Sequence, residues 1–191
     1  IDAGAKLIMT AHITLPNVDD EVEFADGTKG YYPATMSEKI MTDILRNDLG
    51  FDGVVITDAL EMAAIAKASL VPGKEGSVEY SANVAEKVIN AGVDLLLIPM
   101  DLTSLKIADA YDEYIAALEK KVEDGVISEA RINESVTRIL KLKKESGILD
   151  YHPLNVDIKQ VIENAGKVVG SSAHHSKEME IALQAITMVK N

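Results

Sequence analysis

Three segments of the sequence repeat one pattern, in which a glycine comes just before a short apolar run. The copies are IDAGAKLIMT at 1–10, FDGVVIT at 51–57 and INAGVDLLLI at 89–98. A glycine of this kind fits the left-handed position that ends a helix, and a continuous apolar run suits a strand covered on both faces. Repeated units of this type require right-handed crossovers and a parallel α/β sheet, either open and doubly wound or closed as a barrel.

Helices are expected between and after these strands, because apolar residues recur there at helical spacing. The sequence TMSE at 35–38 matches a capping box at the start of the first helix. Glycines stand after the first, third and fourth helices. The predicted helices cover residues 35–49, 77–91, 105–122 and 132–140, and the second leads into a strand at 94–98.

The sequence changes character at Asp150, where a proline appears and periodic apolar residues become few. We expect residues 150–156 to be a linker. A last helical stretch, SKEMEIALQA, then runs into ITMVKN. The first residues read as the end of a helix and the last as a strand without a partner, so both ends are expected to be cut.

Composition excludes several classes of partner and site. The net charge of −12 argues against nucleic acid and against anionic membrane surfaces, which require clustered Lys and Arg. No apolar stretch reaches the length of about 20 residues that a membrane span needs. The chain has no cysteine, hence no thiol nucleophile and no thiolate metal site. Nothing in the sequence predicts a cofactor or a metal, and localisation stays open.

Asp58 follows the apolar run at 54–57 directly. In parallel α/β folds ligands bind at the carboxyl ends of the strands, which makes Asp58 the leading catalytic candidate. The alternative is structural, because Asp58 and Glu61 also form a D-x-x-E helix start, in which Asp58 would only cap the helix.

Two other polar residues end predicted strands. His12 follows the first strand and is expected at the same edge as Asp58, either facing a ligand or simply packed and hydrogen-bonded. Asp101 follows the third strand, but DLTS at 101–104 also reads as a loop and N-cap. His174 and His175 are adjacent and would point about 100° apart on a helix, so they cannot together chelate one metal ion.

Three stretches resemble the last third of the catalytic barrel of glycoside hydrolase family 3: AKLIMTAHI, YPATMSEKIMTDILRNDLGFDGVVITDALEMAAI and AGVDLLLIPMD. The resemblance implies the C-terminal portion of a (β/α)8 TIM barrel, with strands six to eight, then a linker and the first helix of an α/β sandwich domain. The implied ranges are 1–149 for the barrel portion, 150–170 for the linker and 171–191 for the start of the second domain.

The resemblance also implies a reaction. In that family the acid after the seventh strand is the nucleophile of a retaining glycosidase, and here that position is Asp58. His12 and Met62 are expected to contact the substrate. The sequence TDALEM resembles the β-N-acetylhexosaminidase branch, whereas β-glucosidases more often carry an aromatic residue after the acid, so the expected substrate is a β-linked N-acetylglucosaminide.

The proton donor of that branch is a histidine in a motif like K-H-F-P-G-H-G, which does not occur in this sequence. We therefore expect the chain to be a fragment that is inactive alone, and that self-associates or needs a missing N-terminal barrel segment. Two rivals stay open beside a β-glucosidase. An aldolase-like lyase would need a lysine at a strand end, where none stands. A non-catalytic carbohydrate-binding or scaffold module would use Asp58 only as a cap.

Overall fold

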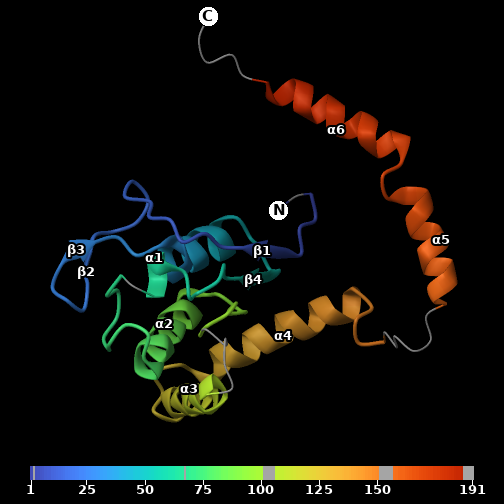
Figure 1. Cartoon of the computed structure of the whole chain (residues 1–191). Coiled ribbons are helices and arrows are strands. Elements are labelled where there is room, and N and C mark those ends of the chain that lie inside the picture. The colour runs from blue at the N-terminus through green and yellow to red at the C-terminus, as the bar shows by residue number, and fades with distance from the viewer. Residues whose placement is uncertain (2, 67, 101–105, 151–156, 187–191) are drawn as a thin grey trace, which may run out of the picture. The chain divides into compact units, whose positions relative to one another are not determined.

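The computed structural model describes residues 1, 3–66, 68–100, 106–150 and 157–186. The chain divides into two compact units, Ile1–Ile148 and Leu149–Asn191. All the strands described in the structure belong to the first unit (Figure 1). None of the helices among the described residues is both long and apolar enough to span a bilayer.

The predicted parallel pairing is confirmed for the first two copies of the glycine pattern. Strand β1 (Leu7–Met9) pairs with β4 (Val54–Ile56) in parallel, with Ile8 opposite Val55 (Figure 1). The third copy lies on the other side of β4, where Leu95 forms a parallel bridge to Ile56. The order is therefore β1, β4 and the segment around Leu95. A separate antiparallel hairpin joins β2 (Val22–Glu23) to β3 (Lys29–Gly30).

The prediction of a strand over 94–98 is wrong in extent, because this segment forms only a single bridge, at Leu95. The amide of Leu97 donates to the Thr57 hydroxyl at 2.8 Å, so a side chain takes the place of a main-chain acceptor in the ladder. Ile98 then adopts a positive φ of 42°, which ends the extended conformation.

Helices follow the predicted order. The helical elements of the first unit are the 3₁₀ turn η1 (Ala34–Met36), the π-helix η2 (Lys39–Asp48), α1 (Ala63–Ala66), α2 (Val78–Ala91), α3 (Lys106–Glu123) and α4 (Glu129–Glu145). The capping box expected at 35–38 is not used by Thr35, which lies inside η1. Instead the Ser37 hydroxyl accepts a hydrogen bond from the Ile40 amide at 3.1 Å.

Local signals at both ends define α2. The Ser77 side chain accepts the Tyr80 amide at the start, and Gly92 ends the helix at φ 117°. A Cβ added at Gly92 would lie 2.6 Å from the Thr42 hydroxyl oxygen, so both the backbone angle and the close approach of η2 demand glycine.

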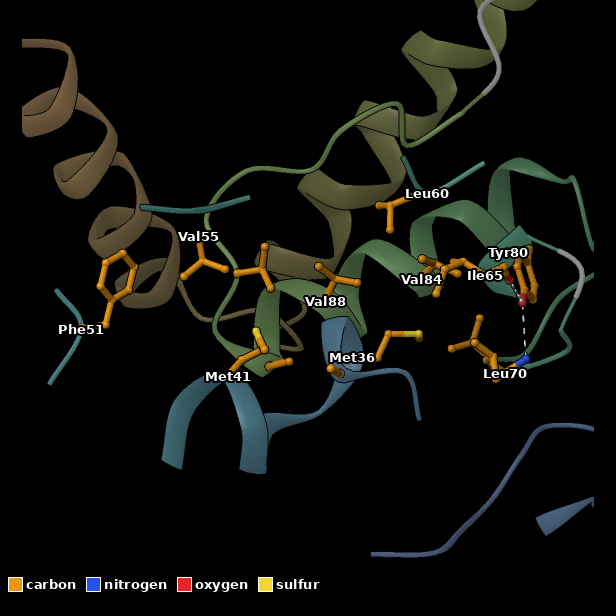
Figure 2. Close-up of a cluster of buried hydrophobic side chains, with 14 residues drawn as sticks. Met36, Met41, Phe51, Val55, Leu60, Ile65, Leu70, Tyr80, Val84 and Val88 are labelled. Carbon is orange, nitrogen blue, oxygen red and sulfur yellow. Dashed lines mark hydrogen bonds between the residues drawn. The ribbon is translucent and has the colours of Figure 1, made fainter. Parts of the chain in front are cut away.

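The core lies between α2, η1, η2 and β4, and Figure 2 shows its side chains. Its most deeply buried members, with no exposed surface, are Met36, Val55, Ile65, Val88 and Val93. Tyr80 brings a polar group into this core. Its hydroxyl donates to the Ile65 carbonyl at 2.7 Å and accepts from the Leu70 amide at 3.3 Å (Figure 2). The ring thus fixes the chain on both sides of the loop after α1.

Tyr80→Phe is expected to lower the free energy of unfolding by about 1–3 kcal/mol, because the Ile65 carbonyl and the Leu70 amide lose a buried partner. Urea unfolding followed by tyrosine emission measures the change. Tyr111→Phe is the matched control, since the Tyr111 hydroxyl has no hydrogen bond to any described residue, and it should shift stability by under about 0.5 kcal/mol. Equal effects of the two substitutions would contradict this role of Tyr80.

A buried ion cluster lies at the opposite end of the third segment from Asp58. The Asp94 side chain is wholly buried and accepts hydrogen bonds from the Val55 amide at 3.0 Å and the Ser135 hydroxyl at 2.8 Å. Three guanidinium groups contact the same carboxylate, from Arg46 at 2.6 Å, Arg131 at 3.3 Å and Arg138 at 3.2 Å. The cluster therefore ties η2 and α4 to the strands.

The pKa of Asp94 reflects two opposing effects. Burial by itself would raise it, but the Val55 and Ser135 hydrogen bonds and the positive charges of Arg46 and Arg138 outweigh burial, so the pKa lies below its ordinary value. The carboxylate is accordingly held in its charged form in the folded protein.

The second unit contains α5 (Ile158–Val168), which begins at the Asp157 cap, and α6 (Ser172–Ala185). Helix α6 confirms the helical stretch predicted there. Helix α5 lies inside the range 150–170 that the family resemblance implies to be a linker, so that range contains a helix over 158–168. Most of the linker expected at 150–156 and most of the ITMVKN run lie outside the described residues.

Candidate active site

The turn after β4 presents Asp58 and is fixed on one side by the third segment. Thr57 is fully buried, and its amide donates to the Leu95 carbonyl at 3.0 Å. The Thr57 hydroxyl accepts the Leu97 amide at 2.8 Å, and the Leu60 amide donates to the Leu97 carbonyl at 3.0 Å. Hydrogen bonds thus bracket Asp58, which stands between Thr57 and Leu60.

Asp58 does not cap a helix. Its carboxylate accepts the amide of the next residue, Ala59, at 2.8 Å, and the side chain is half-buried. Helix α1 starts only at Ala63, and its amides at Ile65 and Ala66 donate to the Met62 carbonyl. The structural alternative for Asp58 therefore has no geometric support, while the placement at a strand end agrees with the catalytic interpretation.

His12 fixes the other side of the same turn. Its Nε2 lies 3.1 Å from the Ala59 carbonyl oxygen, and its Nδ1 lies 2.9 Å from the Thr35 hydroxyl. The structure therefore brings His12 to the edge that carries Asp58, as expected for residues that follow neighbouring parallel strands. Both ring nitrogens contact protein atoms, so in this arrangement neither is available to a sugar.

Two candidates remain, which are Met62, expected to contact the substrate, and Asp101, expected at the end of the third strand. The Met62 amide donates to the Ala59 carbonyl at 3.2 Å, and its side chain is 44% exposed beside the Asp58 turn. Asp101 lies outside the described residues.

An open cavity of about 670 Å³ begins next to this turn. It runs from Leu60 and Glu61 to the first turns of α2 and to Met100, and Asp58 itself is not part of its lining. The cavity leaves room beside the turn for a group larger than the reacting atoms. No group of three potential metal ligands occurs within the described ranges.

Thr35 is the residue that sequence reasoning missed. Its side chain is fully buried, and its hydroxyl contacts the Thr10 hydroxyl at 2.8 Å and donates to the Ala11 carbonyl at 3.2 Å. The T-x-x-E pattern suggested a helix cap instead. The only sequence signal for the true contact is that Thr10 ends its strand as Thr57 does, which points to paired polar residues at that edge.

Comparisons with known proteins agree on one family. Residues 1–142 match the model described as the glycosyl hydrolase family 3 N terminal domain. Beta-hexosaminidase A of Pseudoalteromonas piscicida is 34% identical over 97% of this chain and 28% of its own length. A beta-N-acetylglucosaminidase/beta-glucosidase of Cellulomonas fimi is 30% identical over 100% of this chain and 29% of its own length.

A solved structure gives the same result. The family 3 beta-N-acetylglucosaminidase of Paenibacillus sp. aligns with a TM-score of 0.63 at 32% identity, over 83% of this chain and 25% of that one. The chain thus spans less than a third of the length of these relatives. With a family model covering residues 1–142 and relatives that align with nearly the whole of this chain, the chain belongs to glycoside hydrolase family 3.

Proposed function

We propose that this protein is a retaining glycoside hydrolase in which Asp58 attacks the anomeric carbon of a β-linked N-acetylglucosaminide. One observation carries the proposal: a half-buried carboxylate stands at the end of β4, in a turn held from both sides by hydrogen bonds, and caps no helix. A nucleophile at the end of a rigid strand is positioned before the substrate arrives, which is what attack on a sugar requires.

The chemistry takes two steps. The Asp58 carboxylate forms a covalent bond to the anomeric carbon while an acid protonates the leaving oxygen, and water then hydrolyses the glycosyl-enzyme. We assign no proton donor among the 191 residues, because the family resemblance places that group in a loop that this sequence lacks. We also propose that β1, β4 and the segment at Leu95 correspond to barrel strands six to eight.

The substrate class rests on the residues after the nucleophile and on the relatives. Ala59 is small where the β-glucosidase branch more often has an aromatic residue, and two relatives carry hexosaminidase or N-acetylglucosaminidase names. β-Glucosides are the second candidate, because the name of the Cellulomonas fimi relative includes beta-glucosidase.

We expect the protein, at its full encoded length, to hydrolyse an aryl β-N-acetylglucosaminide with a kcat/KM about 10- to 200-fold above that for the aryl β-glucoside. An apolar pocket that gains the methyl group of the acetamido substituent discriminates by about this much. Release of the aryl group reports both reactions. A higher kcat/KM for the glucoside would overturn the substrate assignment and leave the glycosidase proposal intact.

A further inference from the structure

We propose that His12 is a positioning residue whose Nε2–H holds the Ala59 carbonyl and thereby fixes the turn that carries Asp58. The inference rests on the proposed function, in which Asp58 is the nucleophile. It assigns His12 a role through the protein rather than the direct contact with substrate that the sequence suggested.

The hydrogen bonds determine where the imidazole carries its proton. The Ala59 carbonyl oxygen can only accept, so the His12 nitrogen 3.1 Å away, Nε2, must donate. Nδ1 faces the Thr35 hydroxyl at 2.9 Å, a group that can either donate or accept. The Thr35 hydroxyl has a single hydrogen, so it donates to Nδ1 when that nitrogen is unprotonated and to the Ala11 carbonyl when Nδ1 itself donates. In both arrangements Nε2 keeps its hydrogen.

Thr35 anchors the ring from behind. Its hydroxyl is fully buried and also contacts Thr10 at 2.8 Å and the Ala11 carbonyl at 3.2 Å. The network therefore joins the end of β1 and the turn η1 to the Asp58 turn through one imidazole. A fully connected polar network of this kind restricts the motion of its members.

Ala59 links the network to the nucleophile. Its carbonyl accepts His12 Nε2, while its amide donates to the Asp58 carboxylate at 2.8 Å. On the far side, the Leu60 amide is held by the Leu97 carbonyl. Loss of the His12 contact would leave the Ala59 carbonyl only the local hydrogen bond from the Met62 amide, so we expect the carboxylate to shift while the fold persists.

This geometry predicts an effect on kcat rather than on KM, because His12 offers the substrate no free nitrogen. Substitution of His12 by Gln or by Asn distinguishes the contact of the ring with Ala59 from its contact with Thr35. The terminal nitrogen of Gln coincides with Nε2 and can keep the bond to Ala59, whereas the terminal group of Asn coincides with Nδ1 and can keep only the contact with Thr35.

The test uses the protein at its full encoded length and an aryl β-N-acetylglucosaminide. His12→Gln should stay within about 5-fold of the unsubstituted kcat, while His12→Asn and His12→Ala should fall by about 10²-fold, as expected for a displaced catalytic group. KM should stay within about 3-fold throughout. His175→Gln, an exposed histidine on α6, is the matched control and should change neither constant.

Three outcomes would overturn the inference. Equal kcat values for the Asn and Gln variants would show that the Ala59 bond does not matter. A rise in KM with unchanged kcat would assign His12 to the substrate. Retained turnover of Asp58→Asn would remove the proposed function and this inference together, whereas an inactive Asp58→Asn beside fully active His12 variants would remove the inference alone.

Discussion

Asp58→Asn is expected to lower kcat by about 10⁴-fold or more, because the amide cannot form the bond to the anomeric carbon. The fold should survive this substitution. The only hydrogen bond of the carboxylate to a described residue comes from the Ala59 amide, and an Asn side-chain oxygen can accept it equally well. The free energy of unfolding should therefore change by less than about 1 kcal/mol. Asp58→Asn should therefore reduce activity without a comparable loss of stability.

The measurement compares kcat of the two proteins at their full encoded length. Asp52→Asn is the matched control, since Asp52 is an exposed carboxylate before β4 and should leave kcat unchanged. A second arm uses Asp58→Gly with added azide, which can enter the space of the lost carboxylate and should restore release of the aryl group. Turnover of Asp58→Asn within about 10-fold of normal would exclude a nucleophilic role.

The parts of the fold that the sequence could predict depend on local physics. Ser77 and Gly92 bound α2 through a side-chain cap and a left-handed residue, both of which involve only neighbouring residues. The placement of Asp58 and His12 at one edge needed a single topological rule, that parallel strands end on the same side. Those predictions were confirmed in position, although the chemical roles stay proposals.

The parts that failed depend on contacts between residues far apart in the chain. Thr35 reads locally as a helix cap, yet Thr10 and His12 provide its partners. The third strand is cut short because the Thr57 hydroxyl, 40 positions away, takes the Leu97 amide. A short stretch of sequence contains only one partner of such a hydrogen bond, so local sequence patterns cannot predict it.

The Asp94 cluster also depends on residues far apart in the chain, since Arg46 on η2 and Arg131 and Arg138 on α4 contact the Asp94 carboxylate. We expect Asp94→Asn to lower the free energy of unfolding by about 3–5 kcal/mol. The amide keeps the shape of the side chain but removes its charge, and three buried or half-buried guanidinium groups then repel one another without a counter-ion. Loss of one partner of a buried ion pair typically costs this much, whereas an exposed pair costs little.

Urea unfolding of the 191-residue chain measures this loss. The chain has no tryptophan, and five of its six tyrosines lie within residues 1–148, so tyrosine emission reports mainly on the first unit. Asp52→Asn again supplies the control, because Asp52 contacts Arg138 at 3.7 Å but is 76% exposed. Its loss should cost under about 1 kcal/mol. Equal losses at Asp52 and Asp94 would show that the buried position confers no special stability.

Lowering the pH should remove the contribution of the Asp94 carboxylate to the free energy of unfolding. The folded-state pKa of Asp94 lies below its ordinary value, so the unfolded chain binds the proton more readily than the folded protein does. The contribution of this carboxylate is therefore complete above about pH 4, the unfolded pKa, and is lost as pH falls through the lower folded pKa. The difference in unfolding free energy between the unsubstituted chain and Asp94→Asn should shrink in that range and stay constant from about pH 5 to 7. A difference that instead persisted undiminished to about pH 2 would mean that the amide destabilises through shape or hydrogen bonding rather than through the missing charge.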